Sequence, residues 1–363
     1  MRSRCVMISQ AERSAHVVGL GLIGSSVALA LGATGWRVTG EDLDPEITDA
    51  ALEAKVIAGR DMSDEHVLLV IATPAGAVAG VARDYLARFA GPQLIATDVA
   101  GVKSSIVSGV ADARFLGGHP MAGSEQRGLK GARLDLFSGC TWVLTPTPMT
   151  SPSTYTTLHG YLRDVGASVV AIDANDHDRL VALASHVPHL LAGALMNEAT
   201  KAAEQDPVLL QLAAGGFRDM TRIAAGDPAI WPDVLFENRE AIDQTLEALE
   251  GRLEALRRAL ATDGRATIED SLHQASVARR QLPGRALSSE NLAYLRIVVS
   301  DRPGVLATVT KAASDLQVNI YDIEIAHGIE GVGGTLLLAV DATLSEALAD
   351  SLAALGFQVA REQ

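Results

Sequence analysis

The stretch Gly19-Leu20-Gly21-Leu22-Ile23-Gly24 decides the fold of the first part of this chain. It ends a strand-like apolar run that starts at His16, and it opens an apolar run of helical length, Ile23–Leu31. In this context a G-x-G-x-x-G pattern predicts a tight strand-to-helix turn whose backbone can approach the pyrophosphate of a dinucleotide. The helix N-terminus adds unpaired N–H groups and the positive end of a dipole. We therefore expect all six residues to bind a dinucleotide cofactor; a glycine-rich turn without a ligand is the alternative.

An acidic position after the next strand-like run bears on which cofactor binds. The run Arg37–Glu41 ends beside Asp42, about 20 residues past the glycines, where an acidic side chain binds the ribose hydroxyls. Glu41 and Asp44 are competing candidates for this role. A carboxylate at this place repels the 2′-phosphate of NADP, so the sequence favours NAD. The alternative is a solvated acid at a strand end with no part in binding.

Two patterns of secondary structure divide the first 281 residues. Short apolar runs alternate with Ala-rich segments of helical length from His16 to about Ala171, which predicts a parallel sheet covered by helices on both faces. Strand-like patterns are then absent from about Asp176 to Arg279, which predicts a helical region with a kink at Pro188. The expected fold class is α/β, with a Rossmann-type domain over residues 14–174 and an all-α middle domain over residues 175–281.

The remaining residues predict a separate, smaller module. A stretch containing Pro, Gly and Ser over residues 282–291 is typical of a linker. Strand-like and helical patterns then follow in the order βαββαβ over residues 292–363. This is the order of a ferredoxin-like α+β module.

Apolar residues in alternating steps of four and three mark the segment Ala241–Ala261. This spacing predicts a helix with an apolar seam. The seam fits a helix of an intrachain bundle and a subunit contact equally well, and the second alternative implies a homodimer. The seam positions are Ile242, Leu246, Leu249, Leu253, Leu256 and Leu260.

Composition argues against several classes of partner. The net charge of -14 disfavours nucleic acids and anionic membranes, since both require a basic surface. No run approaches about 18 uninterrupted apolar residues, and the first residues lack the apolar core of a signal peptide. The two cysteines, Cys5 and Cys140, do not make a disulfide framework. We expect a cytoplasmic protein that binds neither nucleic acid nor membrane.

A second motif, GGHPMAGSE at residues 117–125, contains the first catalytic candidate, His119. Imidazole titrates near neutrality, which suits a base that takes a hydroxyl proton in a dehydrogenase. Ligands of open α/β sheets lie beyond the carboxyl ends of the strands, so we expect this histidine on a loop at such an end. A loop histidine held by backbone hydrogen bonds is an equal alternative.

Two further clusters fall in the predicted helical region. His186 and His189 are three residues apart and share a helix face, where they line a substrate pocket or lie in the core. No metal site is expected, because no third ligand stands at zinc spacing. Arg218 and Arg222 are four residues apart and suit a clamp for a carboxylate; a surface helix with an ion pair to Asp219 is the alternative.

These motifs, in this order, resemble the prephenate/arogenate (cyclohexadienyl) dehydrogenase family of tyrosine biosynthesis. The resemblance covers about residues 15–250 and rests most on GGHPMAGSE and GGFRDMTRIAAGDPAIW. It also includes VVGLGLIGSSVALAL, TGEDLDP, IATP, TDVAGVK and SHVPHLLA. It implies NAD-dependent oxidative decarboxylation of prephenate to 4-hydroxyphenylpyruvate and carbon dioxide. Arogenate, which would give tyrosine directly, is the alternative substrate.

The resemblance also implies roles for individual residues. His119 matches the base that is hydrogen-bonded to the ring hydroxyl, and Arg222 matches an arginine that binds a substrate carboxylate, oriented by Asp219. Thr73 and Pro74 of the IATP segment belong to the cofactor site on the same basis. The other residues that the resemblance places around the substrate are His186, His189, Ser124 and Glu125, the last two at the mouth of the pocket.

One position departs from the family pattern. Many members carry a serine, which supports the catalytic histidine, where this chain has Gly101 in the segment TDVAGVK. The group that orients His119 is therefore open at this point. Ser104, a backbone carbonyl and a water molecule are the candidates.

The C-terminal segment carries DRPGVL, residues 301–306, and a later Asn-Ile pair, and it resembles an ACT domain. The resemblance implies an amino-acid site at the turn, and our hypothesis is that tyrosine binds there as a feedback effector. A role in assembly alone is the alternative. The implied regulatory residues are Asp301, Pro303, Gly304 and Asn319.

Two other functions compete with the dehydrogenase of a cyclohexadienol. A β-hydroxy-acid dehydrogenase shares the Rossmann-plus-helical plan but lacks the GGHPMAGSE loop. A non-catalytic sensor of NAD or an amino acid is supported by Gly101 and opposed by the presence of His119 and Arg222.

Overall fold

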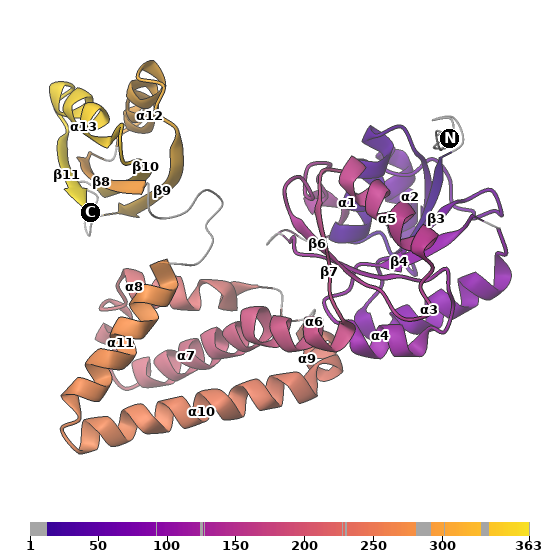
Figure 1. Cartoon of the computed structure of the whole chain (residues 1–363), viewed down its shortest axis with the longest axis horizontal. Helices are drawn as coiled ribbons and strands as arrows, with labels where there is room; N and C mark the ends of the chain where they lie inside the picture. Colours follow the sequence, from indigo (N-terminus) through magenta and orange to yellow (C-terminus); the bar gives the residue numbers. More distant parts are fainter. Residues whose placement is uncertain are drawn as a thin grey trace, which may run out of the picture. The chain divides into compact units, whose positions relative to one another are not determined.

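The computed structural model describes residues 13–91, 93–123, 126, 128–226, 228, 231–280, 292–300, 302–327 and 334–362. The chain forms two compact units that divide between Glu250 and Gly251, and each is described here by itself (Figure 1). This division cuts helix α10 (Arg239–Ala261), so the end of the predicted helical domain belongs to unit 2. The predicted linker, residues 282–291, lies outside the described residues.

Unit 1 begins with a parallel sheet in the order β2-β1-β3-β4. The order reverses at β1, which pairs with β2 on one side and with β3 on the other. Cofactors of open α/β sheets bind at such a switch point, and the glycine stretch starts directly after β1. The strands are β1 (Ser14–Val18), β2 (Arg37–Glu41), β3 (Leu68–Ile71) and β4 (Ile95–Asp98).

Strand β3 is apolar throughout because helices cover both faces of the sheet. Leu68 and Val70 pack into one core with residues of α1 and α5, while Leu69 and Ile71 pack into a second core with residues of α3 and α4. Successive strand residues point to opposite faces, so one apolar run serves both cores. The predicted helix-covered parallel sheet is confirmed. The helices of this part are α1 (Leu22–Ala33), α2 (Pro45–Glu53), α3 (Ala75–Arg88), α4 (Ser104–Gly109) and α5 (Pro152–Asp164).

A mixed sheet follows, and it changes the position expected for the catalytic candidate. Strand β5 (Gly117–Pro120) is antiparallel to β6 (Thr141–Thr145), which is parallel to β7 (Ser168–Ala171); the short helix η2 (Leu129–Gly131) lies between β5 and β6. His119 therefore lies on a strand, opposite Val143, and the expectation of a loop position was wrong. The antiparallel pairing with β6 supplies the partners that keep GGHP extended.

The helical run from Ala174 to Ala203 consists of α6 (Ala174–Val181), the π-helical turn η3 (Ala182–His186) and α7 (Val187–Ala203). Pro188 has no N–H and cannot complete an α-helical hydrogen bond, so the predicted kink takes the form of a wider turn just before it. By length and composition alone this run is long and apolar enough to cross a membrane, a property that core helices of other proteins share. Within the run, Ala182 and Val187 are buried against Ile242 of α10.

The apolar seam of α10 has two different environments. Ile242, Leu246 and Leu249 pack against the η3–α7 segment, which agrees with the intrachain alternative. Leu253 and Leu260 are 52% and 72% exposed, so the second half of the seam presents apolar side chains at the surface. The remaining helical elements of unit 1 are η4 (Pro207–Leu210), α8 (Gly215–Thr221), η5 (Arg222–Ala225) and α9 (Trp231–Glu237).

Unit 2 contains α11 (Arg265–Arg280) and an antiparallel sheet in the order β11-β8-β10-β9. The predicted βαββαβ order is confirmed, and both helices lie on one face of the sheet, where they bury Leu295, Ile297, Leu336 and Leu338 (Figure 1). The elements are β8 (Leu292–Val299), α12 (Val305–Asp315), β9 (Ile320–His327), β10 (Gly334–Asp341), α13 (Ser345–Ala354) and β11 (Gln358–Glu362).

Candidate active site

The glycine stretch forms the turn between β1 and α1, as its spacing predicts. Gly19 has a φ of +92°, and a Cβ atom there would lie 2.5 Å from the carbonyl oxygen of Ala72. A Cβ atom on Gly24 would lie 1.9 Å from the carbonyl oxygen of Gly19. Gly21, in contrast, has open space around its Cα, and no side chain caps the helix that it precedes. Two of the glycines thus close the turn, and the third leaves the α1 N-terminus accessible to a ligand.

Of the three acidic candidates after β2, Asp42 is the one tied to this turn. Its Oδ2 atom accepts a hydrogen bond of 2.7 Å from the Leu20 N–H. The Glu41 carboxylate instead accepts the hydroxyl of Tyr85, and Asp44 caps α2 by accepting the Glu46 N–H at 2.9 Å. Asp42 therefore occupies the place that a ribose-binding carboxylate requires.

A buried hydroxyl supports the assignment of a cofactor to this turn. Thr73 follows β3, and its Oγ1 atom is buried without a hydrogen-bond partner among the described residues. Pro74 comes next and precedes α3. A buried polar atom without a partner is unfavourable unless a ligand or water completes it. Together with the open Gly21 and the placement of Asp42, this hydroxyl fits a bound dinucleotide.

A fully buried ion pair fixes the strand that carries His119. Lys103 and Asp98 have side chains with no solvent exposure and contact each other directly. Lys103 Nζ also donates to the carbonyl oxygen of Gly118 at 2.8 Å, and Asp98 Oδ1 accepts the Gly118 N–H at 3.1 Å. The N–H and the carbonyl oxygen of Gly118, the residue before His119, are therefore both hydrogen-bonded to charged side chains.

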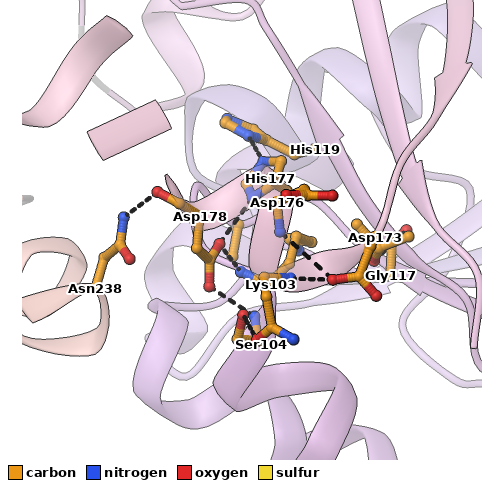
Figure 2. Close-up of polar contacts among 12 residues, drawn as sticks. Lys103, Ser104, Gly117, His119, Asp173, Asp176, His177, Asp178 and Asn238 are labelled. Atoms are coloured by element: carbon orange, nitrogen blue, oxygen red, sulfur yellow. Dashed lines mark hydrogen bonds and ion pairs between the residues drawn. The ribbon is translucent and has the colours of Figure 1, made fainter. Parts of the chain in front are cut away.

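His119 is joined to a second histidine and a carboxylate (Figure 2). Its Nδ1 atom lies 2.8 Å from Nε2 of His177, and Nδ1 of His177 lies 2.7 Å from Oδ1 of Asp178. Backbone N–H groups of Lys103 and Ser104 donate to the two oxygens of Asp178, each at 2.8 Å. Ser104, which was one candidate for orienting His119, uses its hydroxyl to contact Asn175 instead.

The surroundings of His119 keep it neutral. Burial lowers the pKa of His119 well below its ordinary value, and the nearby Lys103 ammonium, His177 and His186 lower it further, with Asp178 acting in the opposite direction. At neutral pH the imidazole is therefore unprotonated at one nitrogen and able to accept a proton.

His186 and His189 both contact Trp231, at the start of α9. The ring of His189 stacks on Trp231 with 3.7 Å between ring centroids, and the ring of His186 meets the same indole edge-on at 6.3 Å. Asn238 Nδ2 donates to the Asp178 carbonyl oxygen at 2.8 Å and lies 3.0 Å from Nδ1 of His186. Burial lowers the pKa of His186 to about 4 and also lowers that of His189. Both rings are thus neutral and belong to one cluster.

The carboxylate-binding candidates lie on a neighbouring segment. Asp219 is exposed on α8, and Arg222 is exposed on η5, which packs against α7. A Cβ atom on Gly226, just after η5, would lie 3.4 Å from the His189 ring, so the end of this segment reaches the histidine cluster. Arg218 Nε donates to the Ala213 carbonyl oxygen at 3.2 Å.

Three predicted site residues, Ser124, Glu125 and Asp301, lie outside the described residues. The residues that the sequence interpretation missed are His177, Asp178, Lys103 and Trp231. The signal for the first two was available in the polar run NDHD at the start of α6, where a buried histidine precedes an acid. Their proximity to His119, 58 positions earlier in the chain, required the fold.

Comparisons with known proteins identify the family. Residues 27–171 match the family profile described as prephenate dehydrogenase, nucleotide-binding domain, and residues 173–274 match the one described as prephenate dehydrogenase, dimerization domain. A prephenate dehydrogenase of Bacillus subtilis is 30% identical over 346 residues, which cover 92% of this chain and 93% of that protein.

Solved structures show the same relationship. Prephenate dehydrogenase from Aquifex aeolicus, in complex with hydroxyphenyl propionate and NAD+, has a TM-score of 0.69 and 26% identity over 75% of this chain and 98% of its own. Arogenate dehydrogenase from Synechocystis has a TM-score of 0.65 and 28% identity over 73% of this chain and 98% of its own. The chain therefore belongs to the prephenate dehydrogenase family, and it is an NAD-dependent oxidoreductase.

Proposed function

We propose that the protein catalyses the oxidative decarboxylation of prephenate to 4-hydroxyphenylpyruvate and carbon dioxide. The observation that carries this proposal is the half-buried, neutral His119 beside Gly101, on a strand next to the dinucleotide-binding sheet. The family membership and the names of the relatives give the reaction class.

In this reaction His119 acts as the base for the ring hydroxyl. It takes the hydroxyl proton while the hydrogen on the same ring carbon leaves with its electron pair. The bound NAD supplies the acceptor for that hydride. Cleavage of the bond to the ring carboxylate then releases carbon dioxide, and its electron pair completes the aromatic ring. The resulting phenolate oxygen takes back the proton from His119, so no net proton is lost.

The remaining candidate residues supply binding. We assign Arg222 to a substrate carboxylate and Asp219 to the orientation of Arg222, as the family resemblance implies. His186, His189 and Trp231 provide a neutral, partly aromatic wall for the ring, which the stacked His189–Trp231 pair supports. We assign Ser124 and Glu125 to the substrate side chain on the family resemblance alone. Asp42 and the glycine turn bind the NAD ribose and pyrophosphate.

Arogenate is the second candidate substrate, and the similarity to the Synechocystis arogenate dehydrogenase favours testing it. The side chain of prephenate carries a keto group, whereas that of arogenate carries an ammonium group. The test is a steady-state assay of NADH or NADPH formation with each substrate and each oxidised cofactor. Turnover of prephenate with NAD supports the proposal, and turnover of arogenate alone replaces the substrate. Absence of turnover with either would point to a non-catalytic sensor.

We further propose that residues 292–363 form an ACT domain that binds tyrosine as a feedback effector. Gly304 has a φ of +92° at the start of α12, and Pro303, Gly304 and Asn319 are exposed, as a ligand-binding turn requires. Deletion of the chain from Leu292 onward should abolish tyrosine inhibition without abolishing turnover. Inhibition that survives this deletion would contradict the regulatory role.

A homodimer in the cytoplasm is the expected assembly and location. The dimerization domain named for the family profile over residues 173–274 and the exposed Leu253 and Leu260 support the dimer. The domain boundaries at 174/175 and 281/282 are part of the same proposal. Light scattering coupled to size-exclusion chromatography measures the assembly directly, and a mass of one 38.0 kDa chain would contradict it.

A further inference from the structure

Gly101 leaves one side of the His119 ring without a polar side chain. A Cβ atom added at Gly101 would lie 3.8 Å from Nε2 of His119, so position 101 faces that nitrogen. The other near neighbour of this added atom is a methyl group of Val234, at 3.9 Å. Glycine at position 101 therefore cannot orient the imidazole through Nε2, whereas Nδ1 has a side-chain partner.

The group at Nδ1 is His177, whose side chain is completely buried. It stands between His119 and Asp178, with ring-nitrogen contacts of 2.8 and 2.7 Å (Figure 2). Asp178 is itself held by the backbone N–H groups of Lys103 and Ser104, at the N-terminus of α4. Backbone N–H groups hold Asp178 in place, and His177 is confined by burial. The two residues that follow His119 in this series of contacts are therefore fixed.

The direction of the hydrogen bonds follows from the charge of Asp178. Burial raises the pKa of Asp178, but hydrogen bonds from His177, from Ser104 and from the N–H group of Lys103 outweigh this effect and hold the pKa below its ordinary value. At neutral pH this carboxylate can only accept, so His177 donates from Nδ1. With the His177 proton on Nδ1, its Nε2 is the acceptor of the 2.8 Å contact, and His119 donates to it from Nδ1. His119 is left with a lone pair on Nε2.

We propose that His177 and Asp178 are positioning residues that hold His119 in the tautomer with an unprotonated Nε2, a task that no side chain at position 101 can perform. This inference rests on the proposed role of His119 as the base. In a catalytic triad a carboxylate fixes the tautomer of the catalytic histidine through Nδ1. Here a second imidazole, that of His177, lies between the carboxylate and the histidine.

The first test is kinetic and uses the full-length protein. Asp178→Asn removes the charge that fixes the proton on His177, and His177→Gln removes the ring while it leaves the backbone contacts of Asp178 in place. We expect each variant to lower kcat about 10- to 100-fold, since a positioned base contributes about 10²- to 10⁴-fold. The KM for substrate and the Kd for NADH should change less than twofold. His273→Asn, at an exposed histidine on α11, is the matched control and should leave all three values unchanged.

The pH profile separates positioning from a general structural role. The Asp178 carboxylate acts to raise the pKa of His119, so Asp178→Asn should shift the acidic limb of kcat/KM to lower pH. The other charged and titratable groups around His119 are Lys103, His177 and His186, and all three are unchanged in Asp178→Asn. Variants with wild-type tryptophan fluorescence, an unmoved acidic limb and kcat within twofold of wild type would overturn the proposal.

A spectroscopic test does not depend on turnover. In ¹⁵N-histidine-labelled protein, with the His119 signals assigned by their loss in His119→Asn, wild type should show a protonated Nδ1 and an unprotonated Nε2. In His177→Gln this preference should be lost. An Nε2-protonated His119 in wild type would refute the inference, even if the protein turns over prephenate. If no substrate is turned over but the predicted tautomer is observed, the proposed function fails and the positioning role of His177 stands.

Discussion

Replacement of Lys103 by methionine tests whether the buried ion pair is needed to hold the strand that carries His119. Lys103 and Asp98 contact each other with no solvent exposure of either side chain. Methionine has a similar length and no charge, so the variant leaves Asp98 as a buried carboxylate without its counter-ion. It also removes the donor to the Gly118 carbonyl oxygen, now held at 2.8 Å.

The expected loss of stability follows from what remains around Asp98. Removal of one partner from a buried ion pair destabilises a protein by about 3–5 kcal/mol. Asp98 would keep hydrogen bonds from the N–H groups of Ala100, at 3.0 Å, and Gly118, at 3.1 Å. Because these two donors still solvate the charge, we expect the lower part of that range, about 3–4 kcal/mol. For a unit of this size that corresponds to a fall in Tm of roughly 6–16 °C.

The assay can follow unit 1 alone. All three tryptophans of the chain, Trp36, Trp142 and Trp231, lie in that unit, so unfolding in urea monitored by tryptophan fluorescence does not report on unit 2. Lys130→Met, at an exposed lysine, is the matched control and should change the free energy of unfolding by less than about 0.5 kcal/mol.

A second variant distinguishes the ion pair from simple loss of packing. Adding Asp98→Asn to Lys103→Met removes the unpaired charge and should restore at least about 1 kcal/mol of the loss, since contacting residues couple by about 0.5–3 kcal/mol. The reasoning is refuted if Lys103→Met costs less than about 1 kcal/mol, or if the second substitution adds its own full cost to the first.

Three other predictions follow from the cofactor turn and the core. Gly24→Ala places a methyl group against the Gly19 carbonyl oxygen and should weaken NADH binding at least about tenfold by fluorescence titration, whereas Gly32→Ala, in open space on the same helix, should stabilise by about 0.5–1 kcal/mol. Asp42→Asn keeps an acceptor for the Leu20 N–H but removes the charge, so the ratio of kcat/KM for NAD over NADP should fall about tenfold, while Asp44→Asn should leave it unchanged. Burial, with a smaller effect from His66, lowers the pKa of His16 from 6.5 to about 3, so the unfolded state binds the extra proton in this window. This one group should therefore lower stability by up to about 1.4 kcal/mol per pH unit below pH 6.5, and His16→Gln should reduce the change of the urea midpoint between pH 6.5 and 5.

The sequence alone determined the elements whose signals are local. The G-x-G-x-x-G spacing placed the β1–α1 turn, because the positive φ of Gly19 and the close contact at Gly24 admit no other residue without strain. Asp42 was expected beside the glycine turn because the distance from that turn to the end of the next strand varies little in this fold, and its carboxylate accepts the Leu20 N–H there. The βαββαβ order of residues 292–363 followed from the alternation of short periodic segments.

Tertiary structure alone decided how His119 is held. Its position on an antiparallel strand depends on pairing with β6, more than 20 positions later, and strand pairing leaves little trace in the local pattern. His177 and Asp178 come from α6, and their hydrogen bonds to His119 and to the Lys103–Ser104 backbone exist because the chain returns to the sheet after β7. A histidine followed by an aspartate at the start of a helix is, as a sequence, equally consistent with an exposed first turn. The packing of α6 buries His177 and Asp178, and burial brings them into hydrogen-bond contact with the proposed base His119.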